Sequence, residues 1–131
     1  MRILDLIRKM NCTKGKVLYA GYNSYQMEGV LVIPKTVEYI EFRTFHSCHG
    51  LTKVHIPYST AYIGEHAFDG CLELCRIEIP ETIVSIGACA FCQCAKLVHI
   101  FYKGINYTEK DAIIYRLQHD DVMVNHSAFA S

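Results

Sequence analysis

A short motif recurs every 23 residues along this chain, and it limits the possible folds more than any other feature. Five sets of apolar positions keep this spacing through three repeats without an insertion. They are Ile33-Pro34, Ile56-Pro57 and Ile79-Pro80; Ile40, Ile63 and Ile86; Phe45, Phe68 and Phe91; Cys48, Cys71 and Cys94; and Leu51, Leu74 and Leu97. Repeats of about 20–50 residues indicate a solenoid, in which each repeat forms one coil and stacked coils share a core.

Each repeat predicts the same sequence of local structures. Apolar and polar residues alternate in Val54-His55-Ile56 and Ile77-Glu78-Ile79, which is the pattern of a half-buried strand. The following proline cannot donate a hydrogen bond to a neighbouring strand, so it ends the strand. A second short extended segment follows, Gly64 or Gly87 permits a turn, and the phenylalanine fills the interior. We therefore expect strands near 31–33, 54–56, 77–79 and 100–102 to lie parallel and adjacent in that order.

The open ends of such a stack need covers. An amphipathic N-terminal helix is predicted, because four apolar residues share one helical face: Ile3, Leu6, Ile7 and Met10. The segment from Lys16 to Gly29 is typical of a degenerate coil or a hairpin. Ile100-Phe101-Tyr102 supplies a fourth strand, but Lys103 then replaces the proline and the pattern ends.

A second helix is predicted near the C-terminus. Thr108 is suited to be its N-cap, with Asp111 near the third helical position and apolar residues at Ile113, Ile114 and Leu117. The sequence gives no assignment for residues 119–131. Four acidic residues of this region are expected to be solvated: Glu109, Asp111, Asp120 and Asp121. The expected organisation is one domain over 1–131, with an N-terminal cap in 1–29, repeats in 30–103 and a C-terminal cap in 104–131.

The middle repeat resembles the BspA-like leucine-rich repeat, whose unit reads I-P, then I-G-x-x-A-F-x-x-C, then L. Its residues run from Ile56-Pro57 through Ile63-Gly64-Glu65-His66-Ala67-Phe68 and Cys71 to Leu74. The repeat from Ile79 matches equally well, whereas the repeat from Ile33 has Glu41 in place of glycine and Thr44 in place of alanine.

This resemblance covers about residues 30–103 and implies an α/β-type solenoid. Together with the predicted helices, the expected fold has short parallel strands, three clear repeats, degenerate terminal coils and helical caps at both ends. It also implies a non-enzymatic, adhesive protein, often found on bacterial or protozoan surfaces. Members of the family are usually long and exported, whereas this chain is short and is not expected to carry an export signal.

Charge and cysteine content bear on location and partners. Thirteen Lys and Arg balance thirteen Asp and Glu, so neither a nucleic acid nor an anionic membrane is an expected partner. Asp5 and Arg8 interrupt the N-terminal apolar residues, which is unlike a secretory signal. Seven cysteines, an odd number, indicate reduced thiols. The expected location is the cytoplasm.

The outward side chains of the stacked strands are the predicted partner-binding residues, because alternate side chains of a strand point away from the core. One column contains Val32, His55, Glu78 and Phe101, and beside it run Val30, Lys53, Arg76 and His99; Tyr39 and Tyr62 are expected to point outward from the next segment. Four such strands expose only about 200 Å². A stable complex buries about 800 Å² per partner, so loops, caps or self-association must contribute.

The remaining cysteines raise the possibility of a metal or catalytic site. Cys89-x-x-Cys92 has the spacing of half a zinc site. The family resemblance implies that Cys71 and Cys94 are buried structural thiols, which leaves Cys75, Cys89 and Cys92 on different sides of the coil. Cys89 and His66 occupy one column, but a shallow convex surface offers no cleft for catalysis. We therefore expect no metal ligand, no cofactor and no catalytic residue.

The sequence thus predicts a non-enzymatic protein-binding module that uses the concave strand face and the caps, with no small-molecule substrate. Two alternatives stay open. One is a stand-alone inhibitor from a phage or mobile element that blocks a host enzyme. The other is a structural solenoid that assembles with copies of itself, which would make the chain a homo-oligomer.

Overall fold

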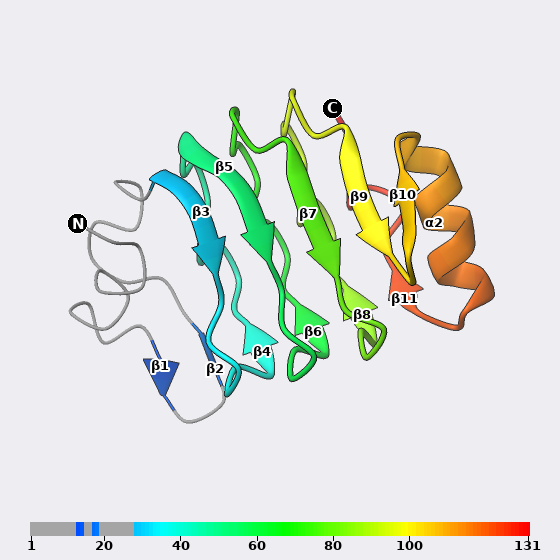
Figure 1. Cartoon of the computed structure of the whole chain (residues 1–131), viewed down its shortest axis with the longest axis horizontal. Coiled ribbons are helices and arrows are strands. Elements are labelled where there is room, and N and C mark those ends of the chain that lie inside the picture. Colours follow the sequence, from blue (N-terminus) through cyan, green and yellow to red (C-terminus); the bar gives the residue numbers. More distant parts are fainter. Residues whose placement is uncertain (1–12, 15–16, 19–27) are drawn as a thin grey trace.

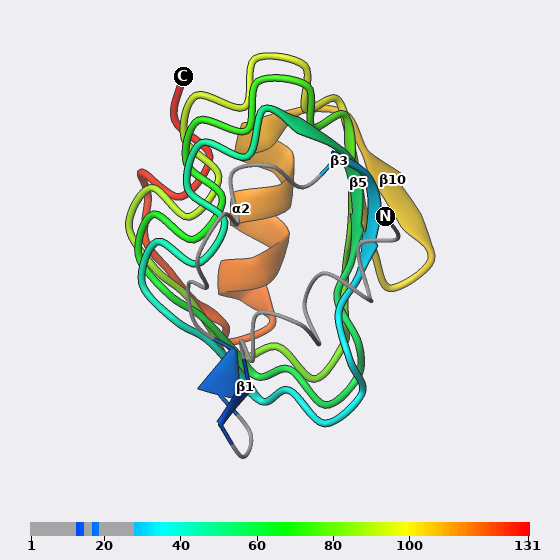
Figure 2. The same cartoon turned by 90° about the vertical axis from the view of Figure 1, so that its left-hand side faces the viewer.

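The computed structural model describes residues 13–14, 17–18 and 28–131, and these form a solenoid with strands on two sides (Figures 1 and 2). One side is a long-strand sheet. Its strands are, in spatial order, β3 (Glu28–Val32), β5 (Gly50–His55), β7 (Arg76–Ile79), β9 (His99–Tyr102) and β10 (Ile105–Tyr107). The first four pair in parallel, which confirms the predicted strand order.

The other side is a short-strand sheet of two-residue strands. In spatial order they are β1 (Thr13–Lys14), β2 (Val17–Leu18), β4 (Tyr39–Ile40), β6 (Tyr62–Ile63), β8 (Ser85–Ile86) and β11 (Met123–Val124). All neighbouring pairs are parallel except β1 with β2. The second extended segment of each repeat therefore forms a ladder of its own.

A column of phenylalanines fills the space between the sheets. Phe45, Phe68 and Phe91 are fully buried, and successive rings stack with centroids 5.1 and 5.2 Å apart. The backbone repeats with the same regularity, since the amides of Phe45 and Phe68 each donate to a carbonyl of the next coil at 2.7 Å. These residues form the core that the spacing predicts.

The cysteine column is also part of the core. Cys48, Cys71 and Cys94 are buried and unoxidised, and the thiols of Cys71 and Cys94 donate to the carbonyl oxygens of Phe45 and Phe68 at 3.2 Å. Burial raises the pKa of the Cys94 thiol to about 12, and a hydrogen bond with Cys48 followed by burial raises the pKa of Cys71. Both thiols therefore stay protonated and serve as structural groups.

Residues 119–131, which could not be assigned from the sequence, complete a fourth coil. β11 pairs with β8, and Phe129 extends the phenylalanine column by stacking on Phe91 at 5.3 Å. Val124 and Ala128-Phe129 match Ile86 and Ala90-Phe91 of the preceding coil, but they lie 38 residues later instead of 23. The extra residues form β10 and a helix, which interrupt this coil.

That helix, α2 (Lys110–His119), lies across the C-terminal end of the solenoid (Figure 2). It buries Ile113 and Leu117, as the predicted C-terminal cap requires. The predicted N-cap is wrong by one residue: Glu109 occupies that position, and its side chain makes no capping hydrogen bond.

Asp120, which follows α2, connects this cap to the end of β9. Its carboxylate accepts a hydrogen bond from Tyr102 at 2.8 Å and pairs with Lys103 and Arg116 at 3.0 Å each. These partners, Lys103 foremost, hold the pKa of Asp120 far below its usual range. Asp120 therefore has a structural role, in contrast to the solvated acidic residue expected from the sequence.

The helical cap predicted for residues 3–10 lies outside the described residues, so α2 is the one helix in the part of the chain that the structure describes. The degenerate coil predicted between Lys16 and Gly29 is partly described. β2 stacks on β4, and β3 begins at Glu28. The solenoid thus continues beyond the first clear repeat.

Gly64 and Gly87 are needed for a different reason from the one the sequence suggests. Neither has the positive φ angle that favours glycine in turns. Instead, a Cβ on Gly64 would lie 2.8 Å from the carbonyl oxygen of Ile40, and one on Gly87 would lie 2.7 Å from the amide nitrogen of Glu65. Glycine here allows consecutive coils to approach closely.

Candidate functional site

The predicted outward residues of the long strands lie in two straight columns. The strand register places Val32, His55, Glu78 and Phe101 side by side, and it likewise aligns Val30, Lys53, Arg76 and His99. We call this surface of eight side chains the long-strand face. Val30 and Val32 are more than half exposed, so the face offers apolar as well as charged contacts.

The centre of the long-strand face is an ordered network across β5, β7 and β9. The guanidinium of Arg76 lies 4.1 Å from the centre of the Phe101 ring and donates to Glu78 at 3.2 Å. The other carboxylate oxygen of Glu78 bonds to the His55 ring. Each side chain restrains the next, so less conformational entropy would be lost on binding than for free side chains.

This network also sets the charge of Glu78. The hydrogen bond with His55, and to a lesser degree the one with Arg76, lowers the pKa of the Glu78 carboxyl. Glu78 therefore stays ionised well below neutral pH, and it places a fixed negative charge between two basic side chains.

Asn106 is a residue of this surface that the sequence analysis missed. β10 pairs antiparallel with β9, and Asn106 stands opposite Phe101 and bonds to the His99 ring at 3.0 Å. The two strands are joined by a two-residue turn, Lys103-Gly104, with both φ angles positive, and the glycine between two apolar segments was the signal for it in the sequence. Such turns are typical of β-hairpins.

Tyr39 and Tyr62 belong to the other side of the molecule. They point outward as predicted, 41% and 39% exposed, but from β4 and β6 of the short-strand sheet. Their rings stack with centroids 4.7 Å apart and planes 4° from parallel. The structure therefore divides the predicted residues between two surfaces.

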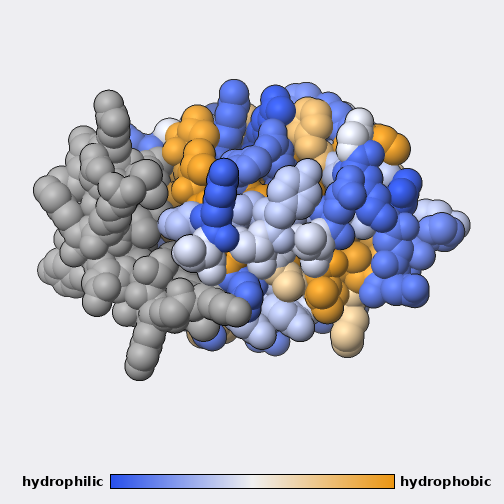
Figure 3. All heavy atoms as spheres, turned by 60° about the horizontal axis from the view of Figure 1, so that its bottom comes forward, coloured by the Kyte–Doolittle hydropathy of each residue, from blue (hydrophilic) through white to orange (hydrophobic). Residues whose placement is uncertain are grey.

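Open hollows lie on both surfaces. On the long-strand face an open hollow lies over Val54, lined by Val30, Lys53, His55, Arg76 and Glu78. Figure 3 views the molecule mainly from the side of the turns that follow the long strands, and there separate hydrophobic patches lie between hydrophilic side chains. Such a mixture of apolar and polar side chains is typical of protein interfaces that are not permanent.

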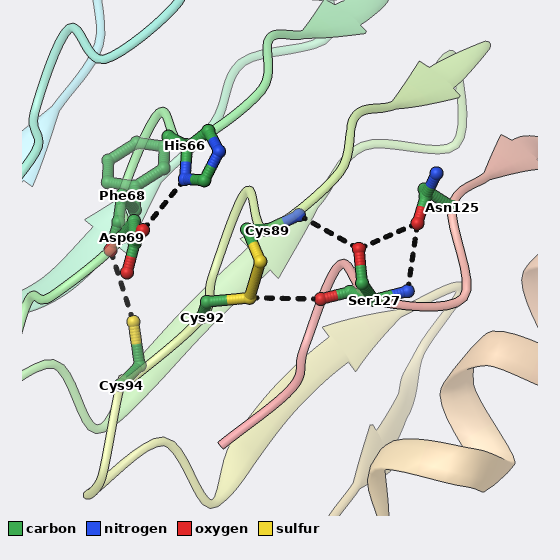
Figure 4. Close-up of a disulfide and its surroundings, with 8 residues drawn as sticks. All are labelled: His66, Phe68, Asp69, Cys89, Cys92, Cys94, Asn125 and Ser127. Atoms are coloured by element: carbon green, nitrogen blue, oxygen red, sulfur yellow. Dashed lines mark hydrogen bonds and ion pairs between the residues drawn. A yellow bond between two sulfur atoms is a disulfide. The ribbon is translucent and has the colours of Figure 1, made fainter.

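Cys89 and Cys92 are closer than the sequence analysis assumed. The repeat register predicts that they lie on different sides of the coil, but they form a disulfide on one turn of the third coil (Figure 4). The amide of Cys89 donates to Ser127 Oγ at 3.3 Å, so this turn supports the fourth coil. His66, predicted to be within possible reach of Cys89, bonds instead to Asp69 of its own coil at 2.8 Å.

The described residues contain no group of three His, Cys, Asp or Glu side chains placed to hold a metal ion. Within the same part of the chain, no helix has the length and apolar character needed to cross a bilayer.

Comparison with known proteins agrees with this architecture. The family model described as "BspA type Leucine rich repeat region (6 copies)" matches residues 19–127. A search of curated proteins finds no match.

Two solved structures are similar. One is the crystal structure of a leucine-rich-repeat protein of T. pallidum, with 31% identity over 66% of this chain and a TM-score of 0.60. The other is a leucine-rich cell surface protein of Faecalibacterium prausnitzii A2-165, with 31% identity over 64% of this chain and a TM-score of 0.47. The chain spans 41% and 28% of these two proteins, respectively.

Proposed function

Because this chain belongs to the BspA-type leucine-rich-repeat family, whose repeats generally act as protein-interaction scaffolds, we propose that it binds a protein partner through the long-strand face. The repeats place outward side chains at fixed intervals, and the core behind them holds the backbone of each strand in position. Such a surface is suited to recognising another folded protein.

The observation that carries this proposal is the stacking of Arg76 on Phe101 at the centre of the face. Arginine and aromatic residues are enriched among the side chains that contribute most to protein interfaces. Here the two are already positioned against each other and joined to Glu78, so a partner would meet a preorganised patch.

The long-strand face alone is smaller than the area that each partner buries in a stable interface, so neighbouring side chains must contribute. Two side chains extend it: Asn106 on β10, opposite Phe101, and Tyr58, which is 74% exposed and lines a hollow with Glu78 and Phe101. The partner is therefore expected to cover the turn after β5 and the β9–β10 hairpin as well as the strands.

Affinity capture followed by variants of the face tests this proposal. Arg76→Ala and Phe101→Ala should each weaken the captured partner by about 1–2 kcal/mol, measured by titration calorimetry. Glu78→Lys should also weaken binding, because it reverses the charge at the centre of the patch. The free energy of unfolding should change little, since all three side chains point away from the core.

Matched controls come from other surfaces. Tyr115→Ala removes a well-exposed aromatic ring from α2, and Lys96→Ala removes an exposed basic side chain paired with Glu73. Neither should alter affinity. If the face variants bind normally and Tyr115→Ala on α2 weakens binding instead, the C-terminal cap forms the interface and the proposal is wrong.

A further inference from the structure

The outward side of the short-strand sheet carries a groove that the proposed interface does not use. One hollow is lined by aromatic and acidic side chains, namely Tyr39, Glu41, Phe42, Tyr62 and Glu65. A second hollow continues past β8 to β11 and shares Glu65, Ser85 and Gly87 with the first. The two therefore form one groove across the coils, which we call the tyrosine groove.

The tyrosine groove contains an unfilled position in its aromatic column. Tyr62 stacks on Tyr39 in the preceding coil, but the strand register places Ser85 next to it in the following coil and Met123 in the coil after that. Serine is too short to cover the second face of the Tyr62 ring. Coils about 4.8 Å apart thus leave a slot over Ser85, with Tyr62 on one side and Met123 on the other.

The charges around the slot are negative and have no counter-ion. Glu41 and Glu65 are exposed on the wall of the groove, and neither forms an ion pair with another described residue. No lysine or arginine is among the residues that line either hollow. Arg43 lies at the edge, where its guanidinium stacks on Phe42 at 5.0 Å. A ligand that carries positive charge would therefore complement this part of the groove.

We propose that the tyrosine groove binds an extended segment of a protein partner through an arginine side chain. The guanidinium lies in the slot over Ser85, stacks on the Tyr62 ring and pairs with the Glu65 carboxylate. Arginine fits better than lysine, because its planar, weakly hydrated group can stack on a ring and bond to a carboxylate at the same time. This inference rests on the proposed function only in taking the ligand to be a protein.

The test uses the full chain and three blocked tripeptides: acetyl-Gly-Arg-Gly-amide and its lysine and citrulline analogues. Binding is followed through the amide signals of Gly64 and Gly87 in ¹H–¹⁵N spectra. The arginine peptide should shift these signals with an affinity that falls as salt rises. The lysine peptide should bind more weakly. Citrulline has the shape of arginine without its charge, so its peptide should not bind.

Three substitutions locate the ligand. Ser85→Tyr should abolish binding by filling the slot with a ring, and it should not destabilise the fold because the side chain points outward. Tyr62→Thr and Glu65→Gln should each weaken binding roughly tenfold. Glu73→Gln is the control, because it removes one carboxylate far from the groove, on the turn before β7.

The proposal is overturned by equal binding of the citrulline peptide, or by undiminished binding to a folded Ser85→Tyr variant. The outcome is independent of the long-strand face, since Arg76→Ala and Phe101→Ala should leave peptide binding unchanged. If the peptides fail to bind while those two variants still weaken binding of the captured partner, the proposal for the groove is wrong and the proposed interface is supported.

Discussion

Phe68 has a phenylalanine ring stacked on each of its faces and no exposed surface. Phe68→Ala would leave a void that regularly spaced coils cannot close, so we expect the free energy of unfolding to fall by about 3–5 kcal/mol. Chemical denaturation measures this loss. Phe42→Ala is the control, because Phe42 is half exposed, and its loss should stay below about 1 kcal/mol. Equal losses for the two variants would contradict the assigned core.

Residues fixed by the repeat could be predicted from the sequence, and residues fixed by unique contacts could not. Phe45 and Cys48 recur with their equivalents at a constant interval, and constant spacing in a solenoid means constant position in each coil. The Cys89–Cys92 disulfide and the Arg76–Phe101 stack each occur once. The 23-residue interval carries no information about pairs that occur only once.

The contact between the C-terminal cap and the end of β9 depends on the ionised carboxylate of Asp120 and is therefore sensitive to acid. Because its partners lower the pKa of Asp120 in the folded state, the ionised carboxylate stabilises the fold above its unfolded pKa of about 3.9. This contribution is lost as the pH falls through the lower, folded value. Asp120→Asn should therefore lower the melting temperature by a constant amount between about pH 5 and 8.

Thermal unfolding of both proteins across this pH range measures the difference. It should shrink below about pH 4, as the carboxylate of the unmodified chain also becomes protonated. Glu109→Gln, at the other end of α2 and without a side-chain capping bond, should show no such trend. A difference that persists unchanged in acid would mean that Asp120 acts by shape and not by charge.

The fourth coil was missed because an insertion interrupts it. β10 and α2 separate β9 from β11, so Val124 and Phe129 fall out of the 23-residue register. A search for a fixed interval cannot find them, although the local order of apolar residues is kept. The second sheet was easier, because Ile40, Ile63 and Ile86 lie within uninterrupted repeats.

In the molecule as a whole, the side chains that stabilise the solenoid lie apart from the side chains proposed to bind partners. The core side chains stack along the axis between the two sheets, whereas the long-strand face and the tyrosine groove lie on the outer sides of different sheets. Substitutions on one surface should therefore leave both the core and the other surface unchanged, as is usual for sites without shared partners.

The same architecture predicts that stability falls from the middle of the stack toward its C-terminal end. Each coil contacts only its neighbours, and Phe129 has a ring partner on one face only. Phe129→Ala should therefore loosen the fourth coil without unfolding the others. Native-state hydrogen exchange should show the Asn125 amide, which donates to Ile86, opening roughly a hundredfold more often.

Amides of β5 and β7 should change much less in the Phe129→Ala variant, because they exchange through opening of the central coils. Phe68→Ala provides the comparison, since it removes a ring from the centre of the stack and should accelerate exchange in both strands. If Phe129→Ala accelerates β5 and β7 as much as Asn125, the coils unfold as one cooperative unit. The nearest-neighbour description of this solenoid would then be wrong.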